Sequence, residues 1–247
     1  MHIVRSVLLV AAALLQIAAS SFPALFGVEG SIGETAEQFR TILVPKGYAF
    51  AIWLPLFIGG IYVALWHAFR PNNPVAHRVG SLAILAFLGN AAWALDQPTI
   101  GPGLVNFLIL EWVLVFAVWS GAAGRAELEP TNANRVAYGF MLALGGWITV
   151  ASPAGLSAAL QKTGMWPLFG NETDGALLIV CIWGAIAFLL ALRLAAFAYT
   201  GPILWGLFAV VVVNEGRASL TTSILIAALL IVGATVVGKW LRSPSAA

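Results

Sequence analysis

The sequence predicts an all-α protein, a polytopic bundle of transmembrane helices. Of its 247 residues, 61% are hydrophobic and only 9% are charged, whereas a soluble domain carries about 25% charged residues. Several stretches are apolar for about 20 residues, which is the length a helix needs to cross the ~30 Å hydrocarbon core. Segments such as ALLIVCIWGAIAFLLAL are apolar on every face, unlike the alternating strands of a membrane barrel. These observations favour helices throughout the chain.

Eight apolar segments follow one another, and each is interpreted as a membrane helix. They cover residues 4–26, 47–69, 78–95, 103–122, 135–160, 175–193, 197–213 and 219–238. The first resembles a signal peptide at its start, but its apolar character continues through Phe22 and Phe26, which favours a retained helix. The seventh is short and contains Gly201-Pro202, so a kinked or partly re-entrant helix is an alternative there.

The distribution of basic residues predicts the orientation of the bundle. With eight crossings and the N-terminus inside, eight of the twelve Lys and Arg residues fall on the inner side and four on the outer side. The inner residues are Arg5, Arg70, Arg78, Arg125, Arg135, Arg193, Lys239 and Arg242. Inner loops carry the excess of Lys and Arg. Both termini are therefore expected in the cytoplasm, at a bacterial-type inner membrane if the chain is prokaryotic.

The organisation of the chain predicts one compact membrane domain. No low-complexity linker or internal repeat divides it, so a transporter built from two similar halves is not indicated. The longest polar pieces, residues 27–46 and 161–174, lie on the expected outer side. Loops of that length can cover a pocket. A net charge of +2 without a Lys/Arg-rich run argues against a nucleic-acid partner.

Motifs of enzymes and metalloproteins do not stand out. His2, His67 and His77 are far apart in sequence, so no metal site is predicted from their spacing. No Gly-rich phosphate loop precedes a Lys-Ser or Lys-Thr pair, and there is no G-x-S-x-G elbow. The sequence therefore gives no support to an enzymatic reading, and no catalytic residue is assigned.

A few polar side chains lie inside apolar segments. Glu111 is close to the middle of its segment, where an ionisable group normally faces the bundle interior, a partner or water. It serves either as a hydrogen-bonding carboxyl between helices or in a ligand or proton role. Asn90 shares a helix face with Trp93 and contacts either a neighbouring helix or a ligand. Ser152 follows Trp147 and precedes a proline that should kink its helix.

The chain has ten tryptophans at different depths. Those near segment ends are interpreted as interface anchors: Trp66, Trp166 and Trp240. The deeper ones are Trp53, Trp93, Trp112, Trp147 and Trp183. A buried indole N–H needs an acceptor, so these side chains favour a cavity with polar partners, with ordinary packing as the alternative.

Residues 45–62, PKGYAFAIWLPLFIGGIY, place five aromatic residues in one segment. Phe50 precedes Trp53 by three residues and Phe57 follows it by four, so the three rings form one stripe on a helix. Tyr48 lies at the outer end, where its hydroxyl reaches water or lipid headgroups. The stripe is interpreted as one wall of a cavity for a flat apolar molecule.

The order of these features resembles the tryptophan-rich sensory protein family, also called translocator proteins or peripheral benzodiazepine receptors. The matching pieces are PKGYAFAIWLPLFIGGIY, LGNAAW and GGWITVASPAGLSAAL. The resemblance covers residues 1–160 as a five-helix core, and residues 161–247 look like the C-terminal extension of longer relatives. It implies binding of porphyrins, sterol-like molecules or synthetic isoquinoline and benzodiazepine ligands.

The sequence and the resemblance together lead to one functional hypothesis and one alternative. The hypothesis is a membrane binding protein or sensor for a planar hydrophobic, tetrapyrrole-like ligand, with no cofactor required. The alternative is a structural or assembly subunit of a larger membrane complex. The expected partners are the lipid bilayer, a hydrophobic small molecule, and either a second copy of the chain or a larger membrane complex. The candidate ligand-binding residues are Tyr48, Phe50, Trp53, Phe57, Asn90, Trp93, Glu111, Trp147, Ala151 and Ser152.

Overall fold

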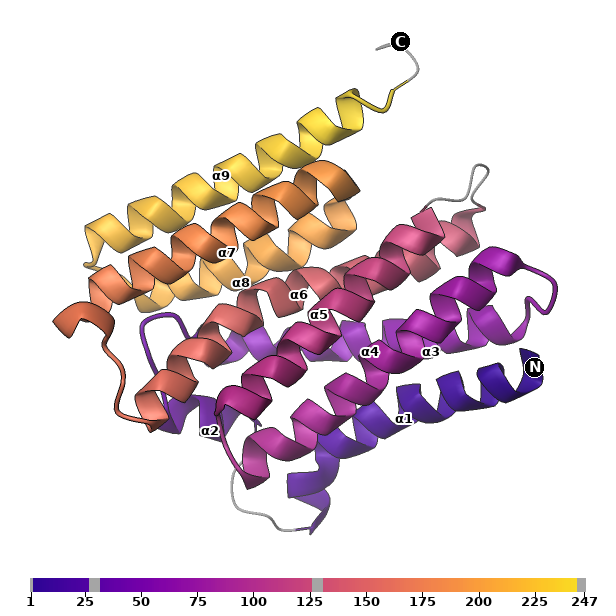
Figure 1. Ribbon diagram of the computed structural model, residues 1–247, viewed down its shortest axis with the longest axis horizontal. Coiled ribbons are helices and arrows are strands. Elements are labelled where there is room, and N and C mark those ends of the chain that lie inside the picture. The colour runs from indigo at the N-terminus through magenta and orange to yellow at the C-terminus, as the bar shows by residue number, and fades with distance from the viewer. Residues whose placement is uncertain (1, 27–31, 126–130, 244–247) are drawn as a thin grey trace.

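The chain is helical along its length. The computed structural model describes residues 2–26, 32–125 and 131–243, and these residues form helices, turns and connecting segments without a strand. Seven helices in the described ranges are long and apolar enough to cross a membrane. The all-α membrane bundle that the composition predicts is therefore confirmed (Figure 1).

Five helices form a closed ring. They are α1 (His2–Phe26), α3 (Trp53–Ala68), α4 (Pro74–Thr99), α5 (Leu104–Arg125) and α6 (Asn132–Lys162). α1 packs against both α3 and α4, α4 packs against α5, α5 against α6, and α6 returns to α3. One continuous cluster of buried apolar side chains fills the ring. All five helices come from the part of the chain that resembles the five-helix core.

Three further helices lie along one side of the ring, as Figure 1 shows in orange to yellow. They are α7 (Glu172–Leu194), α8 (Phe197–Val213) and α9 (Ala218–Trp240). α8 packs against α6, and α9 packs against α7 and α8. α8 is unbroken across Pro202, but its 17 residues span only about 25 Å, less than the hydrocarbon core. The division of one compact membrane domain into a core over residues 1–160 and an extension over residues 161–247 stays a prediction.

The contact between α6 and α8 depends on a glycine. A Cβ built on Gly146 would lie 2.1 Å from the backbone oxygen of Tyr199, so only glycine lets the two backbones approach so closely. The hydroxyls of Tyr199 and Thr149 are hydrogen bonded at 2.9 Å beside this contact. The extension is thus attached to the ring by close backbone packing as well as by apolar side chains.

Short helices occupy the end of the bundle opposite the start of α1. They are α2 (Ile32–Gln38), η1 (Gly47–Ile52) and η2 (Leu168–Gly170). The predicted helix over 47–69 therefore begins as a 3₁₀ helix and continues as α3. Of the predicted outer loop, residues 27–31 lie outside the described residues.

The start of α1 and the end of α9 lie at the same end of the bundle (Figure 1). An even number of crossings produces this arrangement, in agreement with the eight apolar segments. Which side of the membrane carries that end stays a prediction from the basic residues.

Candidate ligand-binding cavity

A cavity inside the ring opens towards α2, and we call it the aromatic cavity. Its volume is about 50 Å³, below the roughly 300–1,000 Å³ of small-molecule pockets, so the wall must move apart to admit a ligand of that size. Its lining residues are Ile32, Ala36, Val44, Pro45, Phe50, Trp53, Trp93, Gln97, Asn106, Leu110, Trp147, Ala151, Ala154, Gly155 and Ala158. Five of the predicted site residues are in this set: Phe50, Trp53, Trp93, Trp147 and Ala151.

The aromatic rings of the cavity pack in a defined order. Trp53 of α3 is stacked between Phe57 and Trp93, with centroid distances of 5.6 and 5.7 Å. Trp147 of α6 meets the Trp53 ring edge-on at 6.2 Å, and Phe50 meets Trp147 edge-on at 6.1 Å. Offset stacks and edge contacts of this kind stabilise aromatic clusters. The rings therefore form a prearranged wall from three helices and η1.

Some polar atoms of this wall have no hydrogen-bond partner among the described residues. They are the indole nitrogens Nε1 of Trp53 and Trp147 and the amide oxygen Oε1 of Gln97. A buried donor or acceptor without a partner costs about 1–3 kcal/mol. A ligand that offers acceptors to the two indoles and a donor to Gln97 would remove that cost. The wall is thus apolar on its ring faces but carries a few polar groups that can orient a ligand.

A chain of hydrogen bonds holds the third tryptophan. The indole N–H of Trp93 donates to Asn106 Oδ1 at 3.1 Å, and Asn106 Nδ2 donates to the Asp96 carboxylate at 2.9 Å. Asn106 is buried while Asp96 is partly exposed. Asp96 therefore supports the cavity wall through Asn106.

We expect Asn106→Ala to lower stability by about 1–3 kcal/mol, because the buried Trp93 indole would lose its acceptor. Thermal unfolding of the purified protein, followed by Trp fluorescence, measures the loss. In the Trp93→Phe background the indole N–H is absent, so the same substitution should cost clearly less. Equal losses in both backgrounds would mean that the bond contributes nothing.

The segment that follows α2 covers the end of the cavity nearest to α2, and we call residues 41–46 the strap. Its residues 41–45 are buried, which is unusual for a loop because buried backbone groups must be paired. Val44 and Pro45 line the aromatic cavity. The sequence expectation that the outer loop covers a pocket agrees with this position.

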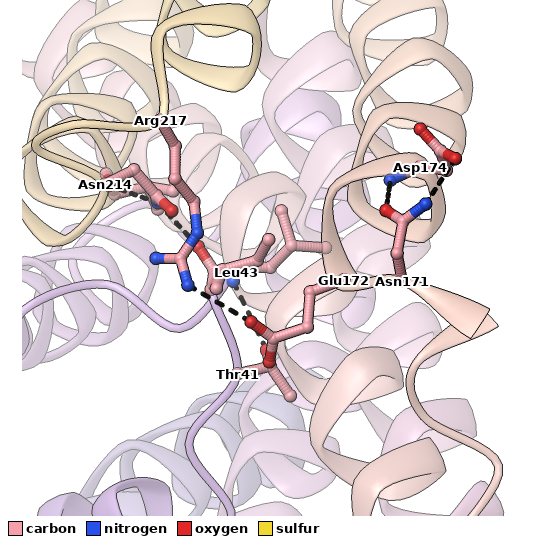
Figure 2. Close-up of polar contacts among 9 residues, drawn as sticks. Thr41, Leu43, Asn171, Glu172, Asp174, Asn214 and Arg217 are labelled. Atoms are coloured by element: carbon pink, nitrogen blue, oxygen red, sulfur yellow. Dashed lines mark hydrogen bonds and ion pairs between the residues drawn. The ribbon is translucent and has the colours of Figure 1, made fainter. Parts of the chain in front are cut away.

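Hydrogen bonds from α6 and α8 fix the strap. Asn214 Nδ2 donates to the backbone oxygen of Ile42 at 2.7 Å, and the backbone N–H of Lys46 donates to the oxygen of Ala209 at 3.3 Å. Thr41 and Ser157 share a hydroxyl hydrogen bond of 2.7 Å. Figure 2 shows Asn214 beside the strap. The extension therefore helps to close the cavity of the ring.

Ion pairs lie at the same end of the molecule. Arg217 and Glu172 approach to 3.2 Å and join α7 to the start of α9 (Figure 2). Both side chains are about 40% exposed, so the pair contributes at most about 1 kcal/mol. Before the strap, the hydrogen bond from Arg40 lowers the pKa of the Glu37 carboxyl, an effect that partial burial opposes.

Small residues on α6 provide the floor of the cavity. Ala151, Ala154 and Ala158 follow Trp147 at intervals of four, three and four residues, the spacing of one helix face. All three line the cavity. Of the three, only Ala151 is among the residues predicted from the sequence. The helical spacing of small residues after Trp147 was the signal that could have found the other two.

Several predicted site residues lie beside the cavity rather than on its wall. Tyr48 is 41% exposed and packs edge-on against Trp205 of α8. Phe57 stacks on the Trp53 ring but is not in the cavity lining. Asn90 is buried and donates to Gln16 of α1 at 2.9 Å, which agrees with the neighbouring-helix interpretation. A direct ligand role for these residues stays a prediction.

Glu111 and Ser152 face each other between α5 and α6. Neither Glu111 Oε1 nor Ser152 Oγ has a hydrogen-bond partner of good geometry among the described residues. Both are outside the lining of the aromatic cavity. Ser152 is fully buried and Glu111 partly buried, so this polar pair favours a role inside the bundle, between helices.

A second cavity of about 50 Å³ lies between α6 and the extension. Leu43 of the strap, Trp183 of α7 and Ala227 of α9 are among its lining residues. Its lining is almost entirely apolar, with Thr149 as the main polar residue. The strap therefore contributes neighbouring residues to two cavities, Leu43 to one and Val44 to the other.

The interpretation of three tryptophans is corrected by the structure. Trp66 and Trp166 are 5% and 6% exposed, so they are buried and not interface anchors. Trp66 donates to Asn134 at 3.0 Å, which accounts for its burial. Trp112 is 48% exposed and donates to the oxygen of Leu85, so it faces outwards and not into a cavity.

The spacing of the histidines along the sequence predicts no metal site, but in the structure the helix ends bring His2, His67 and His77 together. One ligand nitrogen from each ring lies within 4.8 Å of the other two. This cluster is at the opposite end of the bundle from the aromatic cavity.

Comparison with protein families gives one match that covers almost the whole chain. A family model described as TSPO-like protein matches residues 2–237, so the match includes the three helices of the extension. Comparison with curated proteins and with solved structures gave no match. The ring of five membrane helices, its aromatic cavity and the family match lead to one conclusion: the chain belongs to the TSPO-like protein family.

Proposed function

We propose that the protein binds a planar hydrophobic ligand, of tetrapyrrole-like shape, in the aromatic cavity and acts as a membrane binding protein or sensor. The observation that carries the proposal is the cavity itself, with Trp53, Trp93 and Trp147 from three helices on one wall. Flat rings stack favourably on aromatic faces. The resemblance to translocator proteins adds porphyrins as the ligand class to test first.

The polar groups of the cavity suggest how such a ligand would be oriented. The indole N–H groups of Trp53 and Trp147 lack acceptors within the described ranges, and a carboxylate or carbonyl of the ligand would provide them. A porphyrin carries both a large flat apolar face and carboxylate side chains. The strap must open or shift to admit it, because residues 41–45 are buried and hydrogen bonded to α6 and α8.

The proposal includes an orientation in the membrane. If the excess of basic residues marks the cytoplasmic side, both termini are cytoplasmic and the strap faces outwards. The ligand would then reach the cavity from the outer side or from the outer leaflet. No group in the aromatic cavity suggests a reaction, so binding is the proposed activity.

A porphyrin titration, followed by quenching of Trp fluorescence, tests the proposal. We expect Trp53→Phe and Trp147→Phe each to weaken binding about fivefold, since a lost stacking contact costs on the order of 1 kcal/mol. Trp240→Phe is the control for quenching at the surface, because Trp240 is 63% exposed. Trp183→Phe is the control for the second cavity.

The controls should keep wild-type affinity. If Trp240→Phe weakened binding as much as the cavity variants, the porphyrin would be binding to the protein surface. If wild-type protein bound no porphyrin and instead co-purified with other subunits, the alternative role as an assembly subunit would replace the proposal.

A further inference from the structure

The three histidines of the chain meet where three helices of the ring begin or end. His2 is the first residue of α1, His67 lies in the last turn of α3, and His77 lies in the first turn of α4. The His2 ring centroid is 4.9 Å from that of His67 and 5.1 Å from that of His77, and the other two are 5.7 Å apart. His67 is fully buried.

In two of the rings, those of His2 and His77, one nitrogen is hydrogen bonded to a backbone oxygen. His2 Nε2 lies 3.1 Å from the oxygen of Ala68, and His77 Nε2 lies 2.8 Å from the oxygen of Pro71. A carbonyl oxygen only accepts, so each of these nitrogens carries the proton. Ordered ligand histidines in metal sites use their second nitrogen in this way.

Ser6 determines which nitrogen of the His67 ring carries the proton. Its hydroxyl donates to the backbone oxygen of His2 at 3.1 Å and lies 3.2 Å from His67 Nδ1. Because the single hydroxyl proton is used by that carbonyl, Ser6 accepts from His67 Nδ1–H. The unprotonated nitrogen of His67 is then Nε2.

The other nitrogens of the three rings are buried acceptors without a donor. They are His2 Nδ1, His67 Nε2 and His77 Nδ1, none of which has a hydrogen-bond partner among the described residues. Buried acceptors without a donor are costly, and one nitrogen from each ring lies within 4.8 Å of the other two. A bound cation satisfies all three at once.

We propose that His2, His67 and His77 bind a divalent transition-metal ion. Three neutral imidazoles suit Zn²⁺, Co²⁺, Ni²⁺ or Cu²⁺, whereas Mg²⁺ and Ca²⁺ prefer oxygen ligands. Three protein ligands leave one tetrahedral position for water or a small anion. The site joins α1 to α3 and α4, so metal binding would stabilise the ring at this end.

To bind a metal ion, the three ligand nitrogens must move slightly closer together. Zn–N bonds of about 2.05 Å place tetrahedral ligand nitrogens about 3.4 Å apart, and the nitrogens here lie within 4.8 Å of one another. His67 is the fixed member: a Cβ on Gly80 would lie 2.4 Å from its ring. His2 and His77 are partly exposed and can move.

The test uses the full-length protein purified with a tag that contains no histidine, stripped with EDTA and titrated with Zn²⁺ against a chromophoric chelator. We expect one ion per chain. His77→Gln removes a ligand and should weaken Zn²⁺ binding roughly 100-fold or more. Ser6→Ala removes only a group that supports a ligand, for which a loss of about 10- to 100-fold is typical. Asn72→Ala, in the exposed loop beside His77, is the matched control and should bind normally.

A second measurement needs no variant. X-ray absorption of the Zn²⁺-loaded wild-type protein should show nitrogen neighbours at about 2.0 Å with the scattering pattern of imidazole. The proposal is overturned if the wild-type protein takes up no stoichiometric Zn²⁺, if His77→Gln binds as tightly as wild type, or if the imidazole pattern is absent.

Discussion

Replacing Gly146 by valine is expected to abolish the folded protein. Even an alanine Cβ would lie 2.1 Å from the backbone oxygen of Tyr199, and backbone atoms of a packed helix cannot give way as a side chain can. α8 would have to move away from α6, with loss of the hydrogen bond between Tyr199 and Thr149. Overpacking typically lowers stability by about 1–3 kcal/mol. Because Gly146→Ala also displaces a helix, we expect its loss of stability to reach or exceed the upper end of that range.

Gly139, two turns earlier on α6, is the matched control. The nearest atom to a Cβ built there is 3.8 Å away, so Gly139→Ala should be neutral or stabilising by up to about 1 kcal/mol. Yield of monodisperse protein and the thermal midpoint in detergent measure both variants. Similar behaviour of Gly139→Ala and Gly146→Ala would contradict the packing of α8 against α6.

Filling the aromatic cavity is expected to remove ligand binding with little loss of stability. Ala154 is 7% exposed and lines the cavity, so the ring in Ala154→Phe would occupy the space that a ligand needs. We expect porphyrin affinity to fall at least tenfold, or about 1.4 kcal/mol, while the thermal midpoint changes little. Titration of the purified variant measures the affinity.

The matched control fills the other cavity. Ala227→Phe puts the same ring beside Trp183, between α7 and α9, and should leave porphyrin affinity unchanged. Loss of binding in Ala227→Phe, with normal binding in Ala154→Phe, would place the ligand in the second cavity.

The helices could be predicted from hydropathy, but their polar first turns could not. The segments predicted at 78–95, 135–160 and 175–193 are α4, α6 and α7, each of which starts three or four residues earlier. Their N-caps are Asn73, Thr131 and Asn171, whose side chains accept from backbone N–H groups. Capping residues could have located these starts, whereas an apolar window excludes them.

The aromatic part of the candidate site could be predicted because helical spacing places its rings on shared faces. Residues that meet only through tertiary packing could not be predicted from the sequence. Asn106 pairs with Trp93 from a neighbouring helix, and Gln16 pairs with Asn90 across the ring. The histidines come from three helix ends, so their meeting depends on the closure of the ring, which spacing along the chain does not reveal.

The most direct test of the central claim is to locate a bound ligand. A planar aromatic probe that carries a diazirine would be photo-crosslinked to the full-length protein, and the labelled peptides would be identified by mass spectrometry. The account predicts labelling at the strap and at residues 151–158 of α6, suppressed by excess porphyrin. Labelling confined to α7 and α9, or labelling that excess porphyrin leaves unchanged, would contradict it.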